Sequence, residues 1–300
     1  MTKKLGLIGF GEAAHGIASG LREVHADLPI MAWDILFSSA DIGRTLHAKA
    51  DLIDVAVATG PGDIFENADI VLSAVTTNQS LVAAEQCAQF ISPGVVFIDL
   101  NSTSPGKKRA VGEIIKSAGG HMVEAAVMDD VPRHGHRVPM LLAGSKAQTA
   151  AKWLTELGMQ TTAIDGGIGQ ASTIKMVRSV FMKGLSAILV ECVIAADRAG
   201  IQNDVLNSIE KTFPGIDWHQ LTARSLTSTA LHAGRRAGEM LECATTLKEL
   251  DINPIMTAAT AERLQELADL GLKGIAERSG TTSIEGFLEN VKAVVMTTDS

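Results

Sequence analysis

Short apolar runs alternate with helix-length amphipathic segments along the first half of the chain. Runs of four to six residues predict strands at Leu5–Ile8, Ile30–Trp33, Ile70–Val75, Val95–Leu100, Met122–Val127 and Met140–Ala143. Several of these runs are apolar at nearly every position, which is typical of strands buried on both faces of a mostly parallel sheet. Between them, helical patterns cover Glu12–His25, Gln79–Phe90 and Pro105–Ala118. This alternation predicts an α/β domain with a doubly wound parallel sheet.

The pattern changes after Ile164, where the glycine-rich segment Asp165–Gly169 ends the series of predicted strands. The segment Ser172–Ala199 contains one glycine and no proline. It predicts a helix about 40 Å long, at ~1.5 Å per residue. Further helical patterns follow at Asn203–Thr212, His219–Glu249, Pro254–Asp269 and Ser283–Met296. We therefore predict two domains, an α/β domain over residues 1–165 and an all-helical domain over residues 166–300.

The composition supports folded domains and excludes several kinds of partner. Of the 300 residues, 46% are hydrophobic and 20% are charged, which is enough apolar material for a core. The net charge is −8 and no block of Lys and Arg occurs, so we expect binding neither to nucleic acid nor to anionic membranes. We find no signal-peptide pattern and no apolar stretch of about 20 residues, and therefore expect no membrane span. The 3 cysteines form no CxxC pair, which favours neither zinc nor disulfides and indicates a reduced, cytoplasmic protein.

A glycine-rich turn follows the first predicted strand and opens the first predicted helix. Its residues are Gly9, Phe10, Gly11, Glu12, Ala13 and Ala14. In a dinucleotide-binding turn, the first glycine permits the tight turn and the second lets the backbone approach a pyrophosphate. The third position needs only a small residue, and Ala14 is small. The helix that begins there offers N–H groups and a positive dipole end to the phosphates. The alternative interpretation is a purely structural turn.

Asp34 ends the second predicted strand, 23 residues after Gly11. That spacing is close to the one expected for a carboxylate that binds the adenosine ribose hydroxyls. The residues after it, Ile35, Leu36 and Phe37, include no arginine. A carboxylate would repel a 2′-phosphate, so the sequence favours NAD over NADP. A solvated acid at the end of a strand is the alternative.

Several segments, taken in order, resemble the β-hydroxyacid dehydrogenase superfamily, which includes 6-phosphogluconate and 3-hydroxyisobutyrate dehydrogenases. The segments are Gly9–Ala14, Val71–Val75, Asp99–Pro105, Glu124–Val131 and Gly169–Lys175. The segments Lys175–Gly184 and Arg235–Met240 look most like a phosphogluconate dehydrogenase-like branch of it. The resemblance implies a Rossmann domain followed by a helical domain, whose long first helix commonly forms a dimer interface. It also implies cofactor contacts at Val75 and Thr76 and a catalytic lysine at Lys175.

The chain departs from the family pattern where the substrate binds. Met128, Asp129 and Asp130 stand where relatives carry Ser-Gly-Gly. Arg178 and Ser179 replace an Asn pair, and Met182 replaces the acid of the phosphogluconate enzymes. We therefore expect this chain to share the fold and the catalytic lysine of the family but not the substrate of its known members. In particular, we expect no decarboxylation of 6-phosphogluconate.

Lys175 is the candidate general base for oxidation of an alcohol. An unperturbed lysine has a pKa near about 10.4, so this role requires neighbours that lower it. Arg178, one turn further on the same predicted helix, is such a neighbour, and Lys183 adds positive charge beside it. The alternative is a solvated basic face on a long helix.

Asn101 and Ser102 directly follow the predicted strand Val95–Leu100, at the edge where ligands of doubly wound sheets bind. We expect them to orient the cofactor carboxamide or the substrate oxygens, unless they belong only to the cap of the next helix. The other substrate candidates are Met128, Asp129, Asp130, Ser179, Lys183, His232 and Arg235. His232, Arg235, Arg236 and Glu239 share one helical face, which can also be an ion-paired surface stripe.

The 129–137 segment is rich in polar residues and is expected to form a loop beside the substrate. Its two histidines, His134 and His136, do not suffice for a metal site, so no metal is expected.

Together these features predict an NAD-dependent dehydrogenase of a small, anionic 2- or 3-hydroxyacid. The long helix carries apolar residues on more than one face, which predicts a homodimer or larger homo-oligomer. Two alternatives remain. One is an imine reductase of the same fold, a class that generally lacks the lysine. The other is a non-catalytic NAD-sensing protein, which would bind the cofactor without turnover.

Overall fold

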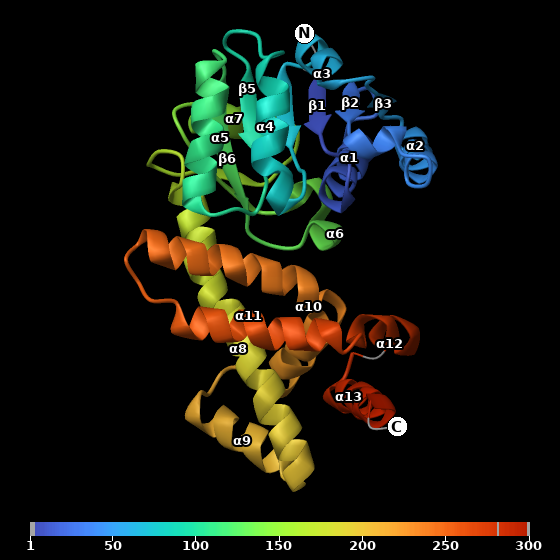
Figure 1. Cartoon of the computed structure of the whole chain (residues 1–300), viewed down its shortest axis with the longest axis vertical. Coiled ribbons are helices and arrows are strands. Elements are labelled where there is room, and N and C mark those ends of the chain that lie inside the picture. Colours follow the sequence, from blue (N-terminus) through green and yellow to red (C-terminus); the bar gives the residue numbers. More distant parts are fainter. Residues whose placement is uncertain (1–3, 281, 299–300) are drawn as a thin grey trace. The chain divides into compact units, whose positions relative to one another are not determined.

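The computed structural model of the chain describes residues 4–280 and 282–298. It divides into two compact units, one ending at Lys175 and the other beginning at Met176. The division falls inside the long helix α8 (Gln170–Ala199), whose first turns belong to the first unit (Figure 1). The sequence predicts the boundary near residue 165, in the glycine-rich segment just before this helix.

The first unit is built on an eight-stranded sheet with the order β3-β2-β1-β4-β5-β6-β7-β8. All neighbouring strands are parallel except β6 and β7, which are antiparallel. The strands are β1 (Leu5–Ile8), β2 (Ile30–Trp33), β3 (Ala56–Val57), β4 (Ile70–Ser73), β5 (Val96–Asp99), β6 (His121–Val127), β7 (Met140–Ala143) and β8 (Thr161–Ala163). The predicted doubly wound α/β fold is confirmed.

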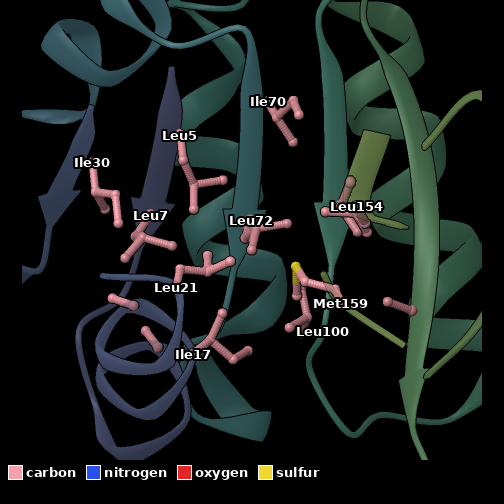
Figure 2. Packing of buried hydrophobic residues seen from close by; sticks show 14 of the residues in the cluster. Leu5, Leu7, Ile17, Leu21, Ile30, Ile70, Leu72, Leu100, Leu154 and Met159 are labelled. Atoms are coloured by element: carbon pink, nitrogen blue, oxygen red, sulfur yellow. The ribbon is translucent and has the colours of Figure 1, made fainter. Parts of the chain in front are cut away.

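Helices cover both faces of this sheet, and β1 shows why its sequence is continuously apolar. Leu5 and Leu7 point into one core, which Figure 2 shows with Ile17 and Leu21 of α1 packed against them. Ile8 points into the core on the opposite face. Successive side chains of a strand alternate between faces, so a strand covered on both sides is apolar at every position.

The first core is completed by α1 (Glu12–Val24), α2 (Gly43–Leu52) and α7 (Ala147–Glu156). The second is completed by α3 (Pro61–Asn67), α4 (Ser80–Ala88) and α5 (Pro105–Ser117). Short elements join these layers: η1 (Ile35–Ser38), η2 (Thr77–Gln79), α6 (Val131–His134) and η3 (Gly135–Arg137). The segment after β6, expected to be a polar loop, is therefore folded into the short elements α6 and η3.

The second unit consists of helices throughout its described residues. The rest of α8 is followed by α9 (Gln202–Thr212), α10 (Trp218–Glu249), α11 (Ile255–Asp269), α12 (Leu272–Ser279) and α13 (Ile284–Thr298). α10 is kinked at His232, whose backbone angles, φ −128° and ψ 17°, are not helical. The main core of this unit joins Val190 and Val193 of α8 to Leu226 of α10, Leu267 of α11 and Phe287 of α13.

By length and composition, α8 resembles a membrane span, with a mean hydropathy of 1.8 over its most apolar window. Part of that window is buried inside the protein, and a core helix of a soluble protein passes the same test. Val190 and Val193 belong to the core, whereas Val177, Phe181 and Ile188 are exposed. The helix is thus apolar on more than one face, as its sequence predicts.

Candidate functional site

The carboxyl ends of four parallel strands bring the candidate residues of the first unit to one edge of the sheet. The turn that begins at Gly9 follows β1, Val75 and Thr76 follow β4, Asn101 follows β5, and Met128 follows β6. In open α/β sheets, ligands bind outside the carboxyl ends of the strands, where the strand order reverses. Here that reversal lies between β1 and β4.

Gly9 is required by the fold itself. Its φ of +87° lies in the left-handed region, and a Cβ at this position would stand 2.7 Å from the carbonyl oxygen of Ala74. Its N–H donates to the carbonyl of Trp33 at 2.8 Å. The turn is therefore locked against the ends of β2 and β4, and no other residue fits there.

Gly11 differs from Gly9, because nothing in the described part of the chain requires a glycine there. Its φ of −77° suits any residue, and a Cβ would meet no atom within 4 Å. It is also the N-cap of α1, and no side chain caps that helix end. The open space and the uncapped N–H groups fit an anionic group held against the turn, such as a dinucleotide pyrophosphate. Glu12, the next residue, is exposed.

Asp34 connects this turn to the end of β2. One carboxylate oxygen, Oδ2, accepts from the N–H of Phe10 at 2.8 Å, and the other, Oδ1, accepts from the N–H of Leu36 at 2.9 Å. Each oxygen retains acceptor capacity for a ligand hydroxyl. The side chains of Ile35 and Leu36 are exposed beside it. Asp34 thus shapes the turn in addition to being available to a ribose.

A groove of about 450 Å³ runs along α1, between that helix and the 131–137 segment. Its polar lining includes His15, Glu23 and His136. A Cβ on Gly20 would stand 2.4 Å from Nδ1 of His136, so this glycine allows the ring to pack against α1. Burial, and then the nearby Arg137, lowers the pKa of His136. Burial, followed by the charge of a nearby lysine, lowers the pKa of His15.

A side-chain contact within the 129–137 segment joins His134 to Asp129. Nε2 of His134 lies 3.2 Å from Oδ2 of Asp129, and Oδ1 of Asp129 accepts from the N–H of Asp130 at 2.8 Å. Within residues 4–280 and 282–298, no group of three or more His, Cys, Asp or Glu side chains is arranged to bind a metal.

Glu124, a buried residue of β6, anchors the start of α8. Its Oε1 accepts from the N–H groups of Gly169 at 2.8 Å and Ala171 at 2.7 Å. Its Oε2 accepts from the hydroxyl of Ser172 at 2.9 Å. Lys175 lies one turn beyond Ser172 in the same helix and is partly buried. The sheet therefore fixes the helix turn that carries Lys175.

The remaining candidates belong to the second unit. Arg178 is exposed and Ser179 is 7% exposed. Lys183 forms an ion pair with Glu239 at 2.7 Å, and Arg235 pairs with the same carboxylate at 2.9 Å. His232 stands at the kink of α10. The helical face of His232, Arg235, Arg236 and Glu239 in α10 is therefore at least partly an ion-paired stripe.

Two buried charged residues beside the site were not predicted from the sequence. Lys108 of α5 pairs with Asp99, the last residue of β5, at 3.1 Å. In the sequence, Asp99 belongs to a predicted strand and to a segment of the family resemblance, but neither feature indicates a charged partner. The available signal was the spacing of Lys108 from Val111 and Ile115, which are buried on the same face of α5. A lysine on an apolar helix face requires a buried partner.

Comparison with known proteins supports one family for the whole chain. Residues 196–267 match a domain of unknown function, DUF1932. The structure of a conserved hypothetical protein from Sinorhizobium meliloti 1021 is 35% identical, covers 98% of this chain and 97% of its own, and has a TM-score of 0.77. The conserved protein MTH1747, of unknown function, is 31% identical over 90% of this chain and 99% of its own, with a TM-score of 0.72. Its structure reveals similarity with 3-hydroxyacid dehydrogenases. The chain belongs to the β-hydroxyacid dehydrogenase-like superfamily.

The family resemblance drawn from the sequence is thereby confirmed. The chain is also similar to the L-threonate dehydrogenase of Cupriavidus necator, which is 24% identical over 225 residues, 73% of this chain and 73% of its own. The comparisons thus support a nicotinamide-dependent oxidoreductase of hydroxyacids at the level of the superfamily. The roles of individual residues stay predictions.

Proposed function

We propose that the protein is an NAD-dependent dehydrogenase of a small, anionic 2- or 3-hydroxyacid, with Lys175 as the group that exchanges a proton with the substrate hydroxyl. The observation that carries this proposal is Gly11. It is an uncapped helix start with open space around it, at the strand edge where the superfamily binds its cofactor.

The cofactor would be held by residues on three strand ends. The backbone from Gly9 to Ala14 would bind the pyrophosphate, and Asp34 the adenosine ribose. Val75, Thr76 and Asn101 would line the remainder. When bound, the nicotinamide supplies a hydride acceptor.

The choice of NAD over NADP rests on Asp34. A 2′-phosphate at the ribose would meet a carboxylate that already accepts hydrogen bonds from two backbone N–H groups. The exposed residues next to it, Ile35 and Leu36, are apolar and offer no positive charge. Both features favour a free ribose hydroxyl over a phosphate.

Oxidation of an alcohol requires a base that takes the hydroxyl proton, and Lys175 is our candidate. Because Glu124 binds the first turn of α8, Lys175 has a fixed position relative to the strand ends of the same unit. A base must lie within hydrogen-bond reach of its proton, and a fixed helix turn favours this.

In the second unit, our candidate for binding an anionic group of the substrate is Arg178. In the first unit, our candidates for contacts with the substrate are the residues after β6, Met128 to Asp130. His232, Arg235, Lys183 and Ser179 remain secondary candidates. Lys183 and Arg235 share the carboxylate of Glu239, so less of their charge is available to a substrate.

We also propose a homodimer or larger homo-oligomer. Val177, Phe181 and Ile188 of α8 recur every four or seven residues and are exposed, so they form one apolar stripe that a second copy can cover. The 3 free thiols fit a reducing compartment, and we propose a cytoplasmic location.

The binding experiment uses a matched pair of glycines. Gly11 and Gly60 are both helix N-caps where a Cβ would have no atom within 4 Å, which makes them a matched pair for substitution by valine. Gly11→Val should weaken NAD binding by at least about tenfold, because the added side chain fills the space through which the pyrophosphate would reach the N–H groups of the turn. Gly60→Val should leave binding unchanged, and both variants should melt near the wild-type temperature. Equal NAD affinity in all three proteins would refute the proposed cofactor site.

Assays of the wild-type protein with NAD and candidate substrates distinguish the proposed dehydrogenase from the two alternative functions. A non-catalytic sensor binds NAD and turns over no hydroxyacid, whereas an imine reductase reduces cyclic imines and leaves hydroxyacids unchanged. Lys175 weighs against the reductase, because that class generally lacks it.

A further inference from the structure

A complete ion pair is buried at the end of β5. Lys108 and Asp99 are 1% and 0% exposed, and Nζ of the lysine lies 3.1 Å from Oδ2 of the aspartate. The same ammonium group donates to the backbone carbonyl of Asp99 at 2.9 Å. The lysine side chain thus extends from α5 to the carboxyl end of the neighbouring strand, and both of its interactions are with one residue.

Stability alone does not account for this pair. Removing two charges from water is costly, and well-packed apolar residues in place of a buried ion pair are often neutral or stabilising. The neighbours of Lys108 on the same helix face, Val111 and Ile115, are apolar and buried. An apolar residue at position 108 would continue that face, so the charge points to a role beyond packing.

The ion pair is the first link of a network that fixes Asn101. Oδ1 of Asp99 accepts from the backbone N–H of Asn101 at 2.9 Å. The side chain of Asn101 then donates through Nδ2 to the hydroxyl of Ser73, at the end of β4, at 3.2 Å. The network holds the asparagine from both sides, since its backbone is bound to β5 and its side chain to β4.

The amide oxygen of Asn101 takes no part in this network. Across residues 4–280 and 282–298, Oδ1 of Asn101 and the hydroxyl oxygens of Ser102 and Thr103 are buried without a hydrogen-bond partner. Buried polar atoms are nearly always paired, so an unpaired cluster indicates a missing ligand or water. An amide oxygen only accepts, so its missing partner is an N–H or O–H donor.

The cluster adjoins the turn that would bind the cofactor. Ala74 follows Ser73, and its carbonyl is the atom against which Gly9 is packed. The amide oxygen held by the network therefore belongs to the same strand edge as that turn.

We infer that Lys108, acting through Asp99, is a positioning residue that holds the amide oxygen of Asn101 ready to accept a hydrogen bond from a ligand N–H or O–H. The inference rests on the proposed function, which offers two sources of that donor. One is the carboxamide of the nicotinamide, and the other is the hydroxyl of the substrate.

The test compares NAD with its acetylpyridine analogue, whose acetyl group has no N–H. Lys108→Met alone would leave a buried carboxylate unpaired, so it is combined with Asp99→Asn, which removes both charges and retains the shapes. Binding of both dinucleotides is measured by titration in the wild type and the double variant, together with the melting temperature and the KM of the best hydroxyacid.

If the carboxamide is the donor, the wild type prefers NAD to the analogue by about fivefold, the value of one net hydrogen bond, and the double variant loses that preference. If the substrate hydroxyl is the donor, the NAD preference is unchanged and KM rises by about the same factor. In both cases the melting temperature stays close to wild type.

Two further variants keep the inference testable if the double variant fails to fold. Asn101→Ala removes the acceptor itself and should reproduce the effect of the double variant, which is either the loss of the NAD preference or the rise in KM. Ser73→Ala removes only the hydroxyl that orients the amide and should give a smaller loss. Where the double variant folds, adding Asn101→Ala to it should cause no further change, because all these residues act through one oxygen.

Three results would overturn the inference. The first is a double variant with wild-type NAD preference and wild-type KM. The second is a loss of both dinucleotides by the same factor together with a lower melting temperature, which would indicate a purely structural pair. The third is a wild type that binds neither dinucleotide, and this result alone would also refute the proposed function.

Discussion

Glu124 should stabilise the first unit through its contacts with the start of α8. It is fully buried and accepts three hydrogen bonds, from the N–H groups of Gly169 and Ala171 and from the hydroxyl of Ser172. Helix N-termini carry unsatisfied N–H groups and a partial positive charge, so a carboxylate is favoured there. Two substitutions separate the charge from the hydrogen bonding.

Glu124→Gln keeps an oxygen for both backbone N–H groups and loses the negative charge. Hydrogen bonds to charged groups exceed neutral ones by roughly 1 kcal/mol, and the helix end adds up to about 1 kcal/mol more. We therefore expect the glutamine variant to lose about 2 kcal/mol of unfolding free energy. Glu124→Ala leaves two buried N–H groups unpaired, at about 1–3 kcal/mol each, so its loss should be about twice as large.

The assay is urea unfolding followed by tryptophan fluorescence. Trp218 is the tryptophan of the second unit, so a Trp218→Phe background makes the signal report on Trp33 and Trp153 of the first unit. Glu113→Gln is the control, because it removes the same charge from an exposed residue of α5 and should change stability by less than about 0.5 kcal/mol.

The reasoning fails if the unfolding free energy of the alanine variant lies within about 1 kcal/mol of that of the background protein, because two buried N–H groups without partners should cost more than this. It also fails if glutamine destabilises as much as alanine, because hydrogen-bond acceptance would then contribute nothing.

Three further predictions concern the cofactor, the assembly and pH. Asp34→Ser should reduce the preference for NAD over NADP, measured as the ratio of the two affinities by titration. Any loosening of the turn affects both ligands and cancels in that ratio, so an unchanged ratio would reject the role of the carboxylate. Phe181→Glu should convert a self-associated protein into monomers by light scattering, whereas Phe213→Glu, at another exposed position, should not; a monomeric wild type would end the proposal of an oligomer. Burial, and then Arg137, lowers the pKa of His136, so the folded protein disfavours the protonated form of this histidine. The neutral ring therefore favours the folded state at a pH above 6.5, the usual pKa of histidine, and this contribution to stability is lost as the pH falls below that value. His136→Gln should flatten the decrease in melting temperature between neutral and mildly acidic pH, and an unchanged slope would exclude this residue as its cause.

The main elements could be predicted from the sequence because their patterns are periodic and long. The runs at Leu5–Ile8, Ile30–Trp33 and Met140–Ala143 have the bounds that the structure gives them. Each end of the long helices of the second half lies within two residues of its predicted position. Each of these segments is either continuously apolar or amphipathic over several turns, which makes its period unambiguous.

The short elements lacked such a signal. β3 (Ala56–Val57) has two residues and β8 (Thr161–Ala163) has three, so neither shows a measurable alternation. The 129–137 segment was expected to be a loop because it is polar. It folds as α6 and η3, and His136 packs against α1 at Gly20, a contact between distant parts of the chain that the local pattern does not indicate.

For the candidate site, the sequence indicated which residues lie at the strand ends but not how they are held. The turn from Gly9 to Ala14 and Asp34 follow from spacing and residue type. The hydrogen bond from Phe10 to Asp34 and the anchoring of α8 by Glu124 do not, since each depends on side chains meeting across the fold. Lys108 was missed for the same reason, because its partner is identified only by the packing of α5 on β5.

The central claim is that hydride transfer to NAD depends on a proton taken up by Lys175. The direct measurement is NADH absorbance during reaction of the protein with NAD and a panel of 2- and 3-hydroxyacids, for the wild type, Lys175→Ala and Lys175→Arg. We predict NADH formation with at least one hydroxyacid and a kcat lower by a factor of about 10² to 10⁴ in the alanine variant, with NAD affinity nearly unchanged. The arginine variant should fail as well, because a guanidinium does not release its proton in this range. An alanine variant that keeps more than about a tenth of the wild-type kcat, or a wild type that binds NAD and oxidises none of the hydroxyacids, would contradict the account.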